Sequence, residues 1–184
     1  MYFRSRSDWR TRLILGAAGG FVGTLAIQAL LTASQKWAPD TLPPLRQDPG
    51  EFIVKAGKEA LPAPVRERIP PVVETGAARM LAIGYGLTFG SLYTLLRPQG
   101  GSPFVDGVIL GLTNWATGYL GWLPALGLMP PVWQQQASQA IAPIAEHALY
   151  GMATVAAYDW LRERVSDSTR PARRIQRLWR AIAG

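Results

Sequence analysis

The sequence predicts an all-α protein, and more narrowly a four-helix transmembrane bundle. Three observations lead to this fold class: long apolar runs poor in charge, basic residues bunched at their ends, and glycines spaced four apart within them. Hydrophobic residues make up 48% of the 184 residues and charged residues only 17%. Such a composition leaves few charges to cover a soluble globule. The chain has no cysteine, which excludes disulfides, thiolate metal sites and a cysteine nucleophile.

The predicted spans are charge-poor runs of about 20 residues, the length needed to cross a bilayer core. A helix buried in a soluble bundle would normally show a polar stripe at helical spacing, and the first run shows none. That run is also longer than the apolar part of a signal peptide, so we expect a retained anchor. The spans are 13–34, 76–96, 104–123 and 138–161. They form a membrane domain over 1–161, which a cytoplasmic tail over 162–184 follows.

The basic residues predict the orientation of these spans. Four arginines precede the first span, Arg97 lies between the second and third, and seven arginines follow the fourth. The connection over 35–75 has six basic residues matched by six acids, and the connection over 124–137 has none. Because cytoplasmic loops carry the excess of lysine and arginine, both termini are expected in the cytoplasm. Tryptophans near both ends of the spans agree with this orientation.

Glycines at spacings of four predict where the helices meet. Small residues at this spacing let two backbones approach closely, and packing can then hold helices together in lipid. Packing within one chain and packing against a partner chain are both open. The glycines concerned are Gly16, Gly19, Gly20, Gly23, Gly86, Gly90, Gly107 and Gly111.

The connection over 35–75 contains a helix start. Asp48 is a candidate N-cap, Pro49 suits the first helical position, and Glu51 stands three residues after the cap. Apolar residues then fall on one face, as in an amphipathic helix lying on the outer membrane surface or on the bundle. We expect it to be either a docking surface or a cap over the helices.

The tail carries a second amphipathic pattern, in which Pro171 is a candidate helix start. Apolar side chains recur at helical spacing, and arginines take the other side. Such a helix suits the headgroups of anionic lipid or a partner protein, whereas nucleic acid is not expected because no base-reading motif is present. The contact residues are predicted to be Arg173, Arg174, Arg177, Trp179 and Arg180.

The fourth span contains the sequence "IAEHALYG", with Glu146 beside the only histidine, His147. A charged carboxylate in hydrocarbon costs roughly 2.5–3.5 kcal/mol unless it is paired or neutralised. We expect Glu146 to pair with Arg79 of the second span, and His147 to hydrogen-bond on another face, to a tyrosine or a backbone carbonyl. In the alternative hypothesis, Glu146, His147 and Asn114 line a path for protons.

Sequence motifs of catalysis are missing. The chain has no phosphate-binding loop, no HExxH and no GxSxG, and one histidine cannot build a multi-histidine metal site. We therefore expect no enzymatic activity, no cofactor and no metal. A lone imidazole could still ligate one haem or chlorophyll, although nothing marks such a pocket.

The segments "GAAGGFVGTLA", "GYGLTFGSLY" and "HALYG", with the proline-rich connection between the first two, resemble the YagU-like bacterial inner-membrane proteins. The similarity runs from about Leu13 to Asp159. It implies a small four-span protein of the bacterial inner membrane that is linked to acid tolerance. The resemblance brings no catalytic residues, and the arginine-rich tail is not expected from that family.

Two functions remain. The first is a non-catalytic accessory or scaffold subunit that contacts anionic lipid on the cytoplasmic side and other membrane proteins or a second copy of itself. The second is a conduit for protons or small solutes that uses Glu146 and His147. A conduit needs polar groups through the whole depth of the membrane, and the first two spans offer few. The sequence therefore favours the first function.

Overall fold

A computed structural model describes residues 9–97 and 102–182, and the side chains among them up to Val165. All regular secondary structure among the described residues is helical, and none of it is a strand. This confirms the predicted all-α class. Four helices form the bundle: α1 (Trp9–Trp37), α4 (Pro71–Leu96), α5 (Pro103–Trp115) and α7 (Ala137–Ile182). Shorter helices connect them: η1 (Pro39–Thr41), α2 (Pro49–Glu59), α3 (Ala63–Arg66), η2 (Ala116–Trp122), α6 (Leu123–Ala125) and η3 (Val132–Gln134).

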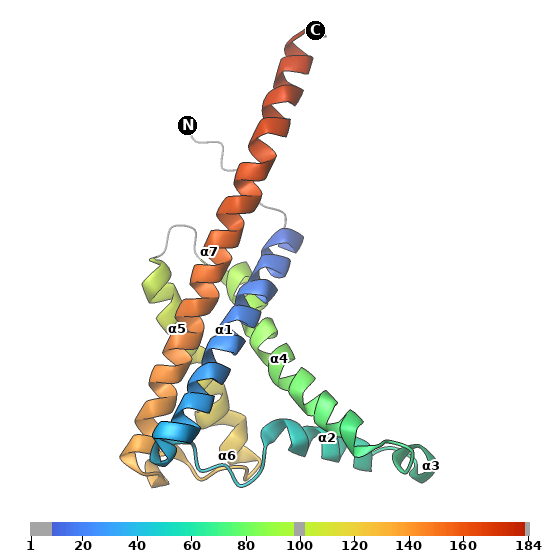
Figure 1. The fold of residues 1–184 in the computed structure, drawn as a ribbon, viewed down its shortest axis with the longest axis vertical. Coiled ribbons are helices and arrows are strands. Elements are labelled where there is room, and N and C mark those ends of the chain that lie inside the picture. Colours follow the sequence, from blue (N-terminus) through green and yellow to red (C-terminus); the bar gives the residue numbers. More distant parts are fainter. Residues whose placement is uncertain (1–8, 98–101, 183–184) are drawn as a thin grey trace.

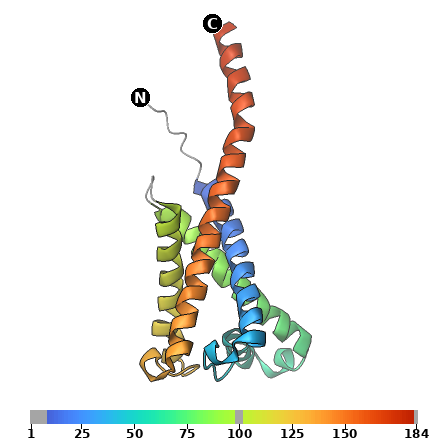
Figure 2. The same cartoon turned by 60° about the vertical axis from the view of Figure 1, so that its left-hand side comes forward.

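The long helices follow one another in the order α4, α1, α7, α5, and α4 runs obliquely, so that its first half diverges from α1 (Figure 1). Helix α1 packs between α4 and α7, and α5 packs on the other side of α7, while α4 and α5 make few contacts with each other. The segments 38–70 and 126–136 lie together at one end, which we call the connecting end. At the other, the terminal end, α1 begins, α4 ends, α5 begins and α7 leaves the bundle (Figure 2).

The helix crossings are built on glycine. An added methyl group at Gly90 would meet the backbone of Gly16 and Gly20 on α1, and one at Gly107 would meet the backbone of Met152 on α7. The other predicted glycines lie in the same kind of contact, at the α1–α4, α1–α7 or α5–α7 crossing: Gly16, Gly19, Gly20, Gly23, Gly86 and Gly111. Their partner surfaces belong to this chain. Gly151, which the spacing pattern missed, faces Gly107 and Gly111.

The predicted third span, 104–123, is not one α-helix. Helix α5 ends at Trp115 after 13 residues, and the backbone then widens into the π-helical η2. Gly121 has φ −103° and ψ −109°, outside the helical region. Glycine tolerates such backbone angles more easily than other residues, so the "ATGYLGW" segment can leave the α-helical path.

The predicted break before the tail is also absent. Helix α7 runs for 46 residues through Pro171, so the fourth predicted span and the tail form one helix that rises past the ends of the other three (Figure 1). Pro171 cannot donate a backbone hydrogen bond, which is why the sequence placed a helix start there. The expected separate tail helix is therefore wrong, although the tail is helical as predicted.

The helix start predicted in the first connection is confirmed. The Asp48 side chain accepts a hydrogen bond from the Glu51 N–H at 2.9 Å and caps α2, with Pro49 at its first position. Helix α2 lies against the first half of α4, and Gly50 lets the two backbones approach at Ala78. Of the predicted apolar face, Phe52 packs against the buried cluster around Tyr119, whereas Ile53 stays 42% exposed.

Helix α1 buries small and polar residues and exposes its large apolar side chains. The buried residues of α1 are four glycines and Thr24, whereas Ile14 and Leu25 on the same helix are 68% and 54% exposed. A soluble helix normally shows the opposite arrangement. Among the helices that the structure describes, α1 alone is long and apolar enough to cross a bilayer by length and composition.

Candidate functional site

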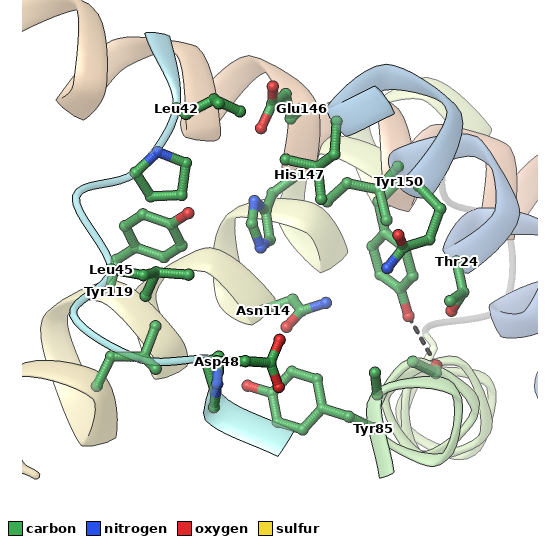
Figure 3. A pocket seen from close by; sticks show the side chains of 18 of the residues that line it. Thr24, Leu42, Leu45, Asp48, Tyr85, Asn114, Tyr119, Glu146, His147 and Tyr150 are labelled. Carbon is green, nitrogen blue, oxygen red and sulfur yellow. Dashed lines mark hydrogen bonds between the residues drawn. The ribbon is translucent and has the colours of Figure 1, made fainter. Parts of the chain in front are cut away.

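A cavity of about 460 Å³ lies in the half of the bundle next to the connecting end. All four long helices contribute to its wall, together with the segment between α1 and α2 (Figure 3). Small-molecule sites in proteins typically have volumes of about 300–1,000 Å³, so this cavity is large enough for a ligand.

Polar side chains reach the cavity from the four long helices, from η2 and from the segment between α1 and α2. Helix α1 contributes a stripe at intervals of three or four residues, namely Thr24, Gln28, Thr32 and Gln35. The polar groups from the other elements are Asp48, Tyr85, Asn114, Tyr119, Glu146, His147 and Tyr150. Several of the lining residues, including Gln35 and Asp48, are exposed, so the cavity meets the surface at the connecting end.

Glu146 sits in the cavity wall about 14 Å along α7 from its first residue. It is 7% exposed, and its Oε1 accepts a hydrogen bond from the Ser34 hydroxyl at 3.2 Å. The expected pair with Arg79 does not form, because Arg79 is exposed on α4 and Glu146 faces α1. Helix α1 lies between α4 and α7, which explains why a serine of α1 replaces the arginine of α4.

His147 lines the same cavity as Glu146. Its Nδ1 donates to the Pro143 carbonyl at 2.8 Å, so a backbone carbonyl is the partner, one of the two alternatives that the sequence left open. In the neutral ring, Nε2 is then an acceptor. The ring also lies edge-on to Tyr119, with 5.5 Å between centroids. Adjacent helical residues point about 100° apart, but the cavity curves around α7 far enough to reach both side chains.

Asn114 and Tyr85 bring unsatisfied polar atoms to the cavity. Asn114 is 5% exposed, and its Oδ1 has no hydrogen-bond partner among the described residues. The Tyr85 hydroxyl is likewise buried and has no partner there. Figure 3 shows both side chains pointing toward the Asp48 carboxylate. A buried polar atom without a partner costs about 1–3 kcal/mol, so the native bundle gains if a water or a ligand satisfies it.

The terminal end of the bundle is closed by a charge network. The Arg97 Nε and a terminal nitrogen of its guanidinium bind Asp106 at 2.7 Å and Asp159 at 2.6 Å, joining the end of α4 to α5 and α7. Burial by itself lowers the pKa of Arg97, but the two carboxylates outweigh it and raise the pKa above its ordinary value. Between this network and the cavity lie the glycine crossings, where backbones touch.

Sequence reasoning singled out Glu146, His147 and Asn114, and the structure brings all three to the cavity. Arg79, which the sequence paired with Glu146, does not line the cavity. The sequence did not predict the contact of Ser34 with Glu146, the place of Asp48 in the cavity wall, or the Arg97 network. The expectation that the first apolar run has no polar stripe is also wrong, because Thr24, Gln28, Thr32 and Gln35 recur at helical spacing on the face of α1 that lines the cavity.

The sequence also selected five residues of the tail for lipid or partner contact. The side chains of Arg173, Arg174, Arg177, Trp179 and Arg180 lie outside the described residues, although their backbone belongs to α7. Comparisons with protein families, curated proteins and solved structures gave no significant match to this chain.

Proposed function

We propose that the protein is a multi-pass protein of the bacterial inner membrane that acts as a non-catalytic accessory or scaffold subunit. The observation that carries this proposal is the combination of glycine at the helix crossings with large apolar side chains exposed on the long helices. Large apolar side chains such as Phe21, Met80 and Ile109 are exposed on different helices, while glycines bring the backbones together where the helices cross. In lipid this arrangement is favourable, because tails cover the apolar surface and close backbone packing holds the helices.

In the proposed topology, α1, α4, α5 with η2, and the first part of α7 cross the membrane. Helices α1 and α4, with 29 and 26 residues, are about 43 and 39 Å long, which exceeds a hydrocarbon core of about 30 Å. The arginine-rich terminal end faces the cytoplasm, and the cavity faces the periplasm. The resemblance to YagU-like proteins would connect this role with acid tolerance.

Accessibility to a membrane-impermeant thiol reagent tests this topology, because the chain has no native cysteine. Single cysteines at the exposed positions Gln47 and Gln136 should react in cells whose outer membrane has been permeabilised. Cysteines at Ser102 and Glu163, exposed at the opposite end, should react only after lysis. Reaction of Glu163→Cys in unlysed cells without reaction of Gln47→Cys would reverse the topology and contradict the proposal.

The extension of α7 supports a scaffold role. Seven arginines follow Leu161 on a helix that projects beyond the bundle, where anionic lipid or an acidic partner surface could meet them. Each arginine near an anionic membrane surface contributes roughly 1 kcal/mol. The alternative function is a conduit for protons or small solutes. The polar cavity would supply such a path through about half of the length of the bundle. The glycine crossings and the Arg97 network fill the other half, which favours binding over passage.

Purification from native membranes in a mild detergent tests the scaffold role. We expect stable partner proteins to co-purify, and we expect replacement of Arg173, Arg174, Arg177 and Arg180 by glutamine to reduce their yield several-fold by removing the proposed contact charges. The matched control replaces four basic residues of the connecting end, Lys36, Lys55, Arg66 and Arg68, by glutamine. Recovery of the protein alone, without partners or bound anionic lipid, would argue against an accessory subunit.

A further inference from the structure

The cavity described above has two carboxylates and neither a lysine nor an arginine in its wall. Asp48 and Glu146 supply carboxylates, His147 supplies an acceptor nitrogen, and the buried Asn114 Oδ1 lacks a partner among the described residues. A ligand with positive charge therefore complements this wall, in which tyrosine, threonine, glutamine and asparagine side chains supply both donors and acceptors. Anionic ligands are disfavoured because each would face two carboxylates without a cation to compensate.

The two carboxylates lie apart. Figure 3 shows Glu146 at one side of the cavity and Asp48 at the other, with His147 and Asn114 between them. Asp48 uses its Oδ1 to cap α2, which leaves its second oxygen free of that contact. Glu146 accepts a hydrogen bond from the Ser34 hydroxyl through Oε1, and this contact does not involve its Oε2. Each carboxylate therefore has a second oxygen that can accept a hydrogen bond from a charged donor group.

The aromatic rings in the cavity wall suit an organic chain. Tyr85, Tyr119 and Tyr150 line the cavity along with apolar groups such as Leu42 and Leu123. Aromatic faces attract ammonium groups and also cover methylene groups. A metal ion fits less well, because no three histidine, aspartate or glutamate residues in the described part of the chain lie close enough to hold one.

We propose that this cavity binds a small aliphatic diamine, with one ammonium group on Glu146 and the other on Asp48. The Asn114 Oδ1 accepts a further hydrogen bond, and the tyrosine rings cover the methylene chain. This inference goes beyond the scaffold role and does not depend on which partners the protein has. If the proposed topology holds, the site is filled from the periplasmic side.

The test is calorimetric titration of the full-length protein in detergent with butane-1,4-diamine. Two probes of matched length separate the contributions, since n-butylamine has one charge and butane-1,4-diol has none. We expect the diamine to bind at least about tenfold more tightly than n-butylamine, a difference of about 1.4 kcal/mol, and the diol not to bind measurably. Equal affinity for diamine and monoamine, or no binding of the diamine up to about 10 mM, would overturn the proposal.

Two conservative variants connect the affinity with the named carboxylates. Glu146→Gln keeps an oxygen for the Ser34 hydroxyl, and Asp48→Asn keeps the N-cap of α2, so both variants should fold. Each is expected to weaken diamine binding about tenfold or more, whereas Glu59→Gln on the exposed side of α2 should leave it unchanged. Diamine binding that survives both cavity substitutions, in variants with native thermal unfolding, would refute the assignment.

Discussion

Replacement of Arg97 by glutamine is expected to lower the free energy of unfolding by about 3–5 kcal/mol, because it removes one partner of a buried ionic network. Arg97 has a side chain only 9% exposed and serves both Asp106 and Asp159. Without the Arg97 guanidinium, Asp106 loses its ion pair, and Asp159 keeps only its contact with the exposed Arg162 at 3.4 Å. The network raises the pKa of Arg97, whose ordinary value is already strongly basic. Arg97 is therefore charged at physiological pH, and its contribution to stability should not change with pH in that range.

The measurement is unfolding of the purified protein in mixed micelles, followed by circular dichroism. Lys58→Gln is the matched control, because Lys58 also forms an ion pair, with Glu74, but one whose side chains are 23% and 30% exposed. We expect this control to lose at most about 1 kcal/mol. Adding Asp106→Asn and Asp159→Asn to Arg97→Gln should restore part of the loss. If Arg97→Gln costs no more than Lys58→Gln, the network does not hold the terminal end together.

Gly90→Ala is expected to destabilise the bundle by about 1–3 kcal/mol, the usual cost of overpacking. A methyl group at this position would lie 2.9 Å from the Gly20 backbone and closer still to the Gly16 carbonyl, so the helices must separate. Backbone atoms cannot rotate away as the end of a long side chain can. The expected result is a lower unfolding midpoint for Gly90→Ala, measured in the same mixed micelles.

Gly84 on the same helix provides the matched control. A methyl group there meets nothing within 4 Å, so Gly84→Ala should be neutral or should stabilise the protein by up to about 1 kcal/mol through helix propensity. The comparison separates packing from propensity, because both variants make the same chemical change in α4. Equal effects of the two substitutions would mean that α1 and α4 do not cross at Gly90.

Local signals in the sequence predicted the elements well. The cap formed by Asp48 and Glu51 depends on neighbouring residues alone, and it was predicted to the residue. The kink at Gly121 and the continuous helix through Pro171 were missed. At Gly121 the backbone leaves the helical region, which glycine tolerates, whereas α7 continues through Pro171 although a proline removes one helical hydrogen bond, so neither outcome follows from the residue type alone.

The hydrogen-bond partners of the polar residues, in contrast, depend on how the helices are arranged around the bundle. The sequence identified Glu146 as needing a partner, because a buried carboxylate is costly, and it proposed the nearest cation at similar depth. Depth along a helix can be counted from the sequence, but the order of helices around the bundle cannot. Helix α1 lies between α4 and α7, so Ser34 is the partner and Arg79 remains at the surface.

The sequence by itself therefore determined the all-α class, the places where helices can approach closely, and the polar residues of the fourth long helix that need partners. These properties follow from composition and from spacing along one helix, which the chain carries locally. Only the tertiary structure decided that Glu146, His147, Asn114 and Asp48 share one cavity, because that depends on contacts between segments up to about a hundred residues apart. It also decided that Arg97 closes the opposite end, where three helices converge on one guanidinium.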